Sequence, residues 1–167
     1  MNRIHICGIH GCGKSTLAQR LSKSEGIPHY NLDDLKYEVR YNKTRSVPER
    51  IDLLSEICAK EEWITEGTWT DYAEESFAMA DIIVHMAFPP LICDYRILLR
   101  FILRKKEESD NLFGALELMR QVHQYYSGEG IVSFRYHQLL INKYGKKSVL
   151  LQNKREIEEF VNSLNKY

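Results

Sequence analysis

The chain has 167 residues, of which 23 are basic and 23 acidic, so its formal net charge is zero. A chain of this length is expected to form one domain whose core needs no disulfide or metal to hold it together. A general nucleic-acid binder would carry a basic surplus, so nucleic acid is not an expected partner. With 44% hydrophobic and 28% charged residues, the composition is that of an ordinary globular protein.

The sequence contains no run of 18 apolar residues, and its most apolar long stretch, residues 82–103, is interrupted by charged residues and prolines. This pattern excludes a membrane-spanning helix. The short apolar segment near the N-terminus runs directly into Gly-Cys-Gly-Lys and does not predict a signal peptide. The four cysteines lack CxxC spacing and the six histidines lack metal-ligand spacing, which predicts free thiols in a reducing, cytoplasmic setting.

Short apolar segments alternate with longer periodic segments along the chain. The expected strands are residues 4–7, 28–31, 63–65, 81–86 and 148–151. The expected helices are residues 14–24, a helix capped by Ser46 with Ile51, Leu54, Ile57 and Cys58 facing inward, and residues 91–105, 112–126 and 155–164. The β-branched run at 81–86 is typical of a parallel strand buried on both faces. This alternation predicts an α/β fold with a doubly wound, parallel, five-stranded sheet.

One region departs from this alternation. Residues 105–111 form a charged run that predicts an exposed loop or lid, although a solvated connection is the simpler interpretation. A helix over 112–126 follows and ends at Ser127-Gly-Glu-Gly. We therefore expect a single domain over residues 1–167, with a helical lid insert at about 104–130.

The segment Gly8–Ser15 matches the phosphate-loop pattern G-x-x-x-x-G-K-[ST]. Its glycines allow backbone N–H groups to curl around phosphate oxygens, and the following helix directs its positive end at the same anion. Lys14 is expected on the β- and γ-phosphates and Ser15 on Mg²⁺. A glycine-rich turn without a ligand is the alternative, and the flanking strand and helix argue against it. The residues predicted to bind ATP here are Gly8, His10, Gly11, Cys12, Gly13, Lys14, Ser15 and Thr16.

Acidic residues follow two of the expected strands. Asp33 and Asp34 come after the second strand, where a carboxylate can orient an attacking hydroxyl or can cap the next helix. We assign the chemistry to Asp33 and the cap to Asp34. Glu66 ends the third strand, where a carboxylate can hold Mg²⁺ together with Ser15, although a surface glutamate beside a turn is the alternative.

Arginines recur every four residues in the helix expected over 91–105. Arg96, Arg100 and Arg104 therefore share one stripe, which suits either a phosphate clamp or a solvated face. Arg135 is expected to join them from the far side of the insert. The residues assigned to the core face of this helix are Leu91, Tyr95, Leu98, Leu99 and Ile102.

The order of these motifs resembles the adenylate-kinase-like P-loop kinases, and within them the branch labelled DNA topology modulation proteins. The resemblance covers nearly the whole chain, and its branch-specific segments are Trp63–Gly67 and Ala80–Val84. It implies that Asp33 contacts the substrate hydroxyl and that Arg96, Arg100 and Arg135 contact phosphates. It also implies that Gln152 and Asn153 line the adenine pocket. The sequence departs from the family at Glu66, where aspartate is usual, and at 105–111, which lacks an arginine-rich lid.

Together these features predict an enzyme that uses ATP and Mg²⁺ to transfer a phosphoryl group to a small-molecule acceptor, such as a nucleotide or another hydroxyl metabolite. The alternative is an ATP-binding regulatory ATPase or switch without small-molecule kinase activity. The zero net charge, the small size and the acid after the second strand favour the kinase. A monomer or a weak homodimer is expected.

Overall fold

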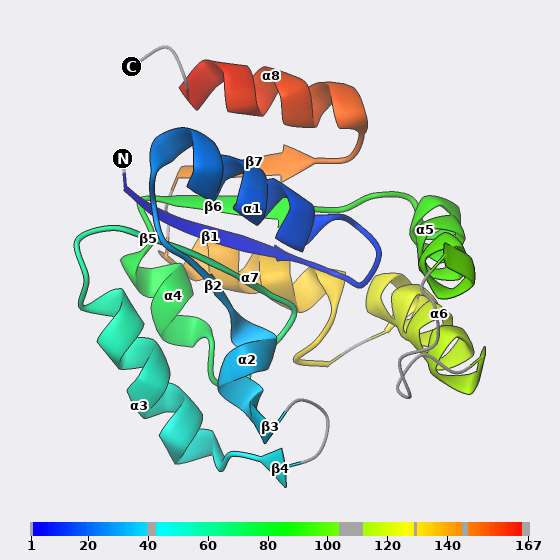
Figure 1. The fold of residues 1–167 in the computed structure, drawn as a ribbon, viewed down its shortest axis with the longest axis horizontal. Helices are drawn as coiled ribbons and strands as arrows, with labels where there is room; N and C mark the ends of the chain where they lie inside the picture. The colour runs from blue at the N-terminus through cyan, green and yellow to red at the C-terminus, as the bar shows by residue number, and fades with distance from the viewer. Residues whose placement is uncertain (1, 40–42, 104–111, 129, 145–146, 165–167) are drawn as a thin grey trace.

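The computed structural model describes residues 2–39, 43–103, 112–128, 130–144 and 147–164. Its centre is a sheet of five parallel strands in the order β2-β5-β1-β6-β7 (Figure 1). The strands are β1 (Arg3–Gly8), β2 (His29–Asn31), β5 (Trp63–Gly67), β6 (Ile82–Met86) and β7 (Lys147–Leu151). This arrangement confirms the predicted doubly wound parallel sheet.

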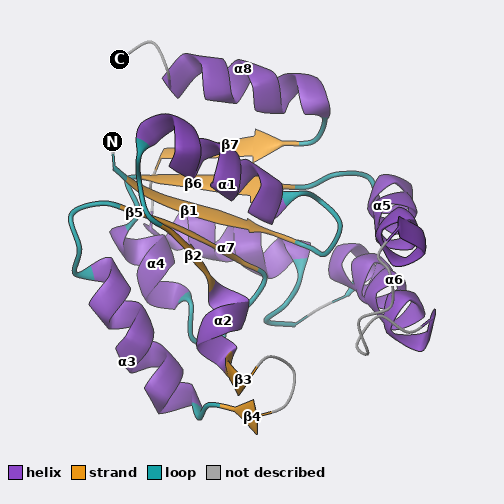
Figure 2. Cartoon of the chain, in the orientation of Figure 1, coloured by secondary structure: helices purple, strands orange, loops and turns teal. Residues whose placement is uncertain are grey.

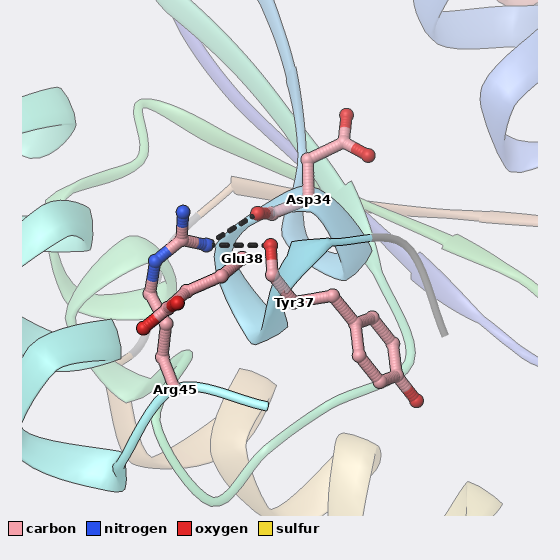
Figure 3. A pocket seen from close by; sticks show the side chains of 4 residues that line it. All are labelled: Asp34, Tyr37, Glu38 and Arg45. Atoms are coloured by element: carbon pink, nitrogen blue, oxygen red, sulfur yellow. Dashed lines mark hydrogen bonds between the residues drawn. The ribbon is translucent and has the colours of Figure 1, made fainter. Parts of the chain in front are cut away.

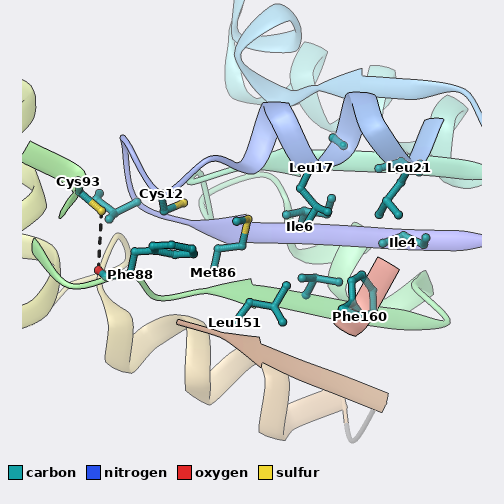
Figure 4. Packing of buried hydrophobic residues seen from close by; sticks show 14 of the residues in the cluster. Ile4, Ile6, Cys12, Leu17, Leu21, Met86, Phe88, Cys93, Leu151 and Phe160 are labelled. Carbon is teal, nitrogen blue, oxygen red and sulfur yellow. Dashed lines mark hydrogen bonds between the residues drawn. The ribbon is translucent and has the colours of Figure 1, made fainter. Parts of the chain in front are cut away.

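Alternating side chains along the central strands build two cores, one on each face of the sheet. On β1, Ile4 and Ile6 join the cluster that also holds Leu17 and Leu21, whereas Cys7 joins the cluster on the opposite face. Figure 4 shows the first cluster packed between the sheet and the neighbouring helices. Because β1 and β6 are covered on both faces, their ends are held in fixed positions.

Helices cover both faces of the sheet (Figure 2). The first cluster takes residues from α1 (Lys14–Glu25) and α8 (Lys154–Leu164), and also from α5 (Pro90–Leu103) and α6 (Leu112–Ser127). The opposite cluster takes residues from α3 (Val47–Cys58), α4 (Glu74–Met79) and α7 (Phe134–Tyr144). The short α2 (Leu32–Lys36) leads into a small antiparallel hairpin made of β3 (Tyr37–Val39) and β4 (Lys43–Thr44).

A second group of helices lies beyond the carboxyl ends of the strands. Figure 1 shows α5 (Pro90–Leu103) and α6 (Leu112–Ser127) together at this end of the sheet. The charged lid predicted at 105–111 lies outside the described residues, as does Arg104, the third arginine of the stripe. The single-domain boundary at 1–167 and the lid insert therefore remain predictions.

Several local predictions are confirmed and others are wrong. Ser46 caps α3 in a capping box, in which its backbone N–H donates to the Glu49 carboxylate at 2.7 Å. Ile51, predicted to face inward, is exposed instead. Helices α4 and α7 and the β3–β4 hairpin were not predicted, because they are short or interrupted by polar residues that become buried only in the folded chain.

The core face of α5 is the largest error. Cys93, Asp94 and Ile97 are buried, whereas the five residues predicted to face the core (Leu91, Tyr95, Leu98, Leu99 and Ile102) are exposed. The prediction followed the more apolar stripe, but the phosphate loop and α6 pack against the other side of the helix. Among the described residues, no helix has both the length and the apolar character required to cross a membrane.

Candidate active site

The phosphate loop joins the end of β1 to the start of α1, as the motif predicts. Gly8 and Gly11 have φ values of 144° and 75°, which side chains other than glycine rarely adopt. A Cβ atom at Gly8 would lie 2.4 Å from the Met86 carbonyl oxygen, and one at Gly11 would lie 2.6 Å from that of Cys93. These glycines therefore let the loop curl tightly against β6 and α5.

Lys14 lies inside this loop rather than on its surface. Its side chain is buried, and its Nζ donates to the Ile9 carbonyl at 3.1 Å. The loop therefore folds back over the lysine stem. An ammonium tied to one carbonyl within a curled backbone keeps two donors for a phosphate oxygen.

Arg96 braces the outside of the same loop. Its Nη1 donates to the carbonyls of Cys12 at 2.9 Å and Gly11 at 3.2 Å, and its guanidinium stacks on the Phe88 ring at 4.4 Å. This half-buried arginine therefore supports the loop from α5. Direct contact between Arg96 and a phosphate remains a prediction.

Ser15, in the first turn of α1, and Glu66, on β5, are the two residues predicted to hold Mg²⁺, and their side chains are in contact. The Ser15 hydroxyl donates to Glu66 Oε1 at 2.7 Å, and Glu66 is almost fully buried at the end of β5. His29 Nε2 lies 3.9 Å from the same oxygen and is a buried atom without a hydrogen-bond partner. Burial lowers the pKa of His29 although Glu66 opposes this, so the ring adds little positive charge at neutral pH. A hydroxyl and a carboxylate fit Mg²⁺, which uses few protein ligands and takes the rest from water and phosphate.

Asp33 is placed at the same edge by hydrogen bonds from two directions. The Asn31 side chain accepts from the Asp33 backbone N–H at 2.8 Å and caps α2. The indole N–H of Trp69 donates to Asp33 Oδ1 at 2.5 Å. Leu32 anchors the turn. It packs so closely on Gly67 that a Cβ atom added to Gly67 would lie 2.8 Å from Leu32 Cβ. One oxygen of the Asp33 carboxylate is thereby fixed.

The assignment of the helix cap to Asp34 is wrong. The helix α2 starts at Leu32, before Asp34, so Asn31 is the cap and both aspartates lie in the first turn. Asp34 instead lines a hollow of about 270 Å³ between α2 and the hairpin, together with Tyr37, Glu38 and Arg45 (Figure 3). Arg45 closes this turn by donating to the carbonyls of Asp34 at 2.9 Å and Tyr37 at 2.7 Å.

Trp69 is a neighbour of Asp33 that the sequence analysis missed. Besides holding Asp33, its ring lies 3.3 Å from Lys36 Nζ, in cation–π contact. Burial lowers the pKa of Lys36, as does nearby Arg50, whereas Asp33 and Asp71 raise it. The available signal was position, because Trp69 follows the Glu66-Gly67 pair at the carboxyl end of a strand.

The remaining predicted residues are less directly placed. His10 lies close enough to Lys14, Asp33 and Arg100 for their charges to act on it. Burial, assisted by Lys14, lowers the pKa of His10 to about 4, so the ring is neutral at physiological pH. Arg100 and Arg135 are exposed on α5 and α7. Thr16 is exposed on the first turn of α1.

Gln152 and Asn153 form the turn from β7 into α8. The Gln152 backbone N–H donates to Glu156 Oε2 at 2.6 Å, and Asn153 Oδ1 accepts from the Glu156 backbone N–H at 3.0 Å. Both residues thus cap α8 at the end of β7, and contact with an adenine ring is left as a prediction.

A buried chain of hydrogen bonds runs beneath the phosphate loop. Tyr125 OH lies 2.8 Å from His85 Nε2 and 2.6 Å from His137 Nδ1. His137 Nε2 lies 3.3 Å from the Thr68 carbonyl, and the Thr68 hydroxyl donates to the Gly8 carbonyl at 2.9 Å. Burial lowers the pKa of His85 to about 4 and that of His137 to about 3.

Neutral rings allow only one direction for this chain. If His137 Nε2 donates to the Thr68 carbonyl, its Nδ1 accepts from Tyr125, whose oxygen then accepts from His85 Nε2. The Gln138 amide completes the set by donating to His85 Nδ1 at 2.7 Å. Each nitrogen and hydroxyl of this hydrogen-bonded chain has a partner. The chain thereby couples α6 and α7 to the start of the phosphate loop.

The sequence spacing gave no sign that histidines meet. Cys7, His85 and His137 place one ligand atom each within 4.8 Å of one another, the geometry of a candidate metal cluster. Tyr125 hydrogen-bonds both imidazoles in this cluster, so a metal would have to displace that hydroxyl. The hydrogen-bonded chain provides partners for both imidazoles without a metal.

The comparisons with known proteins agree with the fold. A shikimate kinase from Bacteroides thetaiotaomicron has a similar structure, with a TM-score of 0.64 and 18% identity over 99% of this chain and 97% of that protein. A shikimate kinase from Acinetobacter baumannii, in complex with shikimate, gives a TM-score of 0.58 and 13% identity over 99% of this chain and 94% of that protein. At these identities the likeness establishes a P-loop nucleotide-kinase-like α/β fold.

The sequence comparisons are narrower. No protein-family model matches the chain. The uncharacterized protein YqaC of Bacillus subtilis strain 168 is 32% identical over 87 residues, a match that covers 52% of this chain. That match spans about half the length of this curated relative, 49%. The topology-modulation branch therefore rests on the resemblance of Trp63–Gly67 and Ala80–Val84 alone.

Proposed function

We propose that this chain is a P-loop kinase that uses ATP and Mg²⁺ to phosphorylate a hydroxyl group of a small polar molecule. The observation that carries the proposal is the meeting of three groups at one sheet edge: the curled phosphate loop, the Ser15–Glu66 pair and the Asp33 carboxylate. A phosphate site alone would serve a switch protein equally well. The oriented carboxylate on the acceptor side favours a transferase.

Each residue has a defined task in this proposal. Lys14 and the loop N–H groups bind the β- and γ-phosphates, and Ser15 and Glu66 hold Mg²⁺, which neutralises charge on the phosphate oxygens. Asp33 accepts the proton of the acceptor hydroxyl as its oxygen bonds to the γ-phosphorus. The bond from that phosphorus to the β–γ bridging oxygen breaks, and ADP leaves. Asp33 needs orientation more than a raised pKa, because the transition state of phosphoryl transfer is loose.

The acceptor side favours a small polar molecule. The hollow beside α2 is lined by Asp34, Tyr37, Glu38 and Arg45, and its volume of about 270 Å³ is at the lower limit of small-ligand pockets. Trp69 and Lys36 border Asp33 on the neighbouring side. These groups offer hydrogen bonds and charge, which suits a hydroxylated metabolite better than an apolar one.

The experiment is a screen of hydroxylated metabolites, with ATP, Mg²⁺ and the purified chain, in which ADP release is followed. The Asp33→Asn variant is screened in parallel as the matched control. A true acceptor raises ADP release with the unmodified chain and not with the variant, and the product carries the new phosphate by mass spectrometry. If ATP binds and no acceptor changes ADP release, the alternative of a regulatory ATPase or switch is favoured.

A further inference from the structure

The outer side of α5 is an apolar face exposed to solvent. Seven large hydrophobic side chains of this helix are exposed, with Leu91 at 77%, Ile102 at 65% and Tyr95 at 64% of full exposure. The full set on α5 is Leu91, Ile92, Tyr95, Leu98, Leu99, Ile102 and Leu103. Contiguous apolar surface of this kind marks an interaction site, because a monomer gains nothing by leaving it in water.

Helix α6 extends the same face at one end. Asp94, near the start of α5, pairs with His123, near the end of α6, at 2.8 Å, so the two helices run in opposite directions. The end of α5 therefore lies near the start of α6, where Leu112, Phe113 and Leu116 are also exposed. Of the seventeen large hydrophobic side chains exposed in the described part of the chain, ten belong to this α5–α6 face.

The spacing along α5 fits a second helix. Leu91, Tyr95, Leu98 and Ile102 are separated by four, three and four residues, the spacing of a seam between two packed helices. The charged side chains of α5 lie off this seam, and the exposed Arg100 is about half a helical turn away from Leu98 and Ile102. Asp94 is buried against His123, and Arg96 contacts the phosphate loop. The seam thus needs an apolar partner with no charge of its own.

We propose that a second copy of this chain covers the α5–α6 face and forms a two-fold symmetric dimer. A covered side chain of this size removes on the order of 100 Å² from water, so the ten offer about 1,000 Å² per chain, above the roughly 800 Å² per partner of a standard interface. A seam of uncharged side chains complements itself across a two-fold axis. The zero net charge of the chain removes long-range repulsion between the copies.

The segment that joins the two helices does not offer a different cover. The sequence that joins the two helices, residues 104–111, consists only of charged and polar residues and supplies no apolar side chain. A charged protein partner would lose the solvation of its charges on this seam without gaining ion pairs. A second α5 supplies matching apolar residues at the required spacing.

Sedimentation velocity between about 1 and 100 µM tests the proposal. The unmodified chain is expected at twice its mass of 19.6 kDa, and the Leu98→Glu/Ile102→Glu variant is expected as a monomer. The variant should keep its circular dichroism spectrum, because both positions are exposed. Leu139→Glu is the matched control, since Leu139 is 55% exposed on α7, away from the face, and it should remain a dimer.

A crosslink tests the symmetry independently. Leu98 is one of the two inner positions of the seam, so Leu98→Cys should pair with its own copy and give a covalent dimer on oxidation. The native cysteines are all buried and should not interfere, and Leu139→Cys should not crosslink. A chain that stays monomeric at 100 µM, or a dimer that survives the double glutamate substitution, overturns the proposal. A monomer that binds a different protein through this face also overturns the proposal.

Discussion

The donor and acceptor sides of the site are built in different ways. On the donor side, Gly8, Gly11 and Lys14 are held by backbone contacts with β6, α5 and the loop itself. On the acceptor side, Asp33 depends on the side chains of Asn31 and Trp69. A phosphate requires the same cradle in any kinase, whereas an acceptor requires a surface suited to itself. Substitutions on the donor side should therefore reduce activity more than those on the acceptor side. The donor side is also easier to recognise from the sequence.

The largest effect is expected on the donor side. Lys14→Ala removes the buried ammonium, and ATP turnover should fall by about 10³-fold because a preorganised charge in a closed loop is lost. ATP affinity, measured by calorimetry, should fall with it. Lys23→Ala, an exposed lysine on the same helix, is the control and should leave both values unchanged. Equal ATP affinity in the two variants would contradict the assignment of the phosphate loop.

A substitution on the acceptor side should separate chemistry from ATP binding. Asp33→Asn keeps the acceptor of the Trp69 hydrogen bond but loses the base, so turnover with an identified acceptor should fall by about 10²-fold while ATP affinity is kept. Asp52→Asn, at an exposed position on α3, is the matched control, because Asp34 lines the proposed acceptor hollow. Loss of turnover in Asp34→Asn alone would show that the base was assigned to the wrong aspartate.

The hydrogen-bonded chain under the phosphate loop makes the donor side sensitive to acid. The pKa values of His85 and His137 lie near 4 and 3 in the folded chain, below the ordinary 6.5 that they regain on unfolding. The unfolded chain therefore binds more protons as the pH falls, so their contribution to stability is complete above pH 6.5 and is lost between pH 6.5 and about 4. Each histidine contributes about 1.4 kcal/mol per pH unit in this window.

Urea unfolding at pH 7 and pH 5 measures this loss, and histidine proton resonances followed by NMR test its origin. The resonances of His85 and His137 should keep their neutral positions down to about pH 5. A titration of either ring near pH 6.5 in the folded chain would contradict the buried neutral chain.

The sequence predicted the donor side because its determinants are local. A strand, eight residues and a helix fix the phosphate loop, and Ser15 and Glu66 meet because neighbouring parallel strands end at one edge. It failed on α5, where the apolar stripe does not face the core. It also failed on Trp69 and on the meeting of His85 with His137, because these contacts join residues 36 and 52 positions apart. No periodicity within a segment reports which distant segment will cover it.

The smallest predicted effect separates the two roles of Trp69. Trp69→Phe keeps an aromatic ring for the cation–π contact with Lys36 but removes the indole N–H that holds Asp33 Oδ1. Freed from this donor, the carboxylate samples more orientations, and kcat should fall about tenfold, which corresponds to the loss of one hydrogen bond to a charged group. The KM for ATP should stay unchanged, because Trp69 contacts neither the phosphate loop nor Glu66 in this structure.

A merely structural role for Trp69 would give a different pattern. If the N–H donor orients the base, its removal should lower kcat and leave the KM for the acceptor and the thermal stability unchanged, because the lost interaction acts in the transition state. Lys36→Met serves as the control, because it removes the cation from the ring and leaves the indole N–H on Asp33. If Trp69→Phe lowers thermal stability and kcat together, Trp69 supports the fold around α2 and does not orient the base.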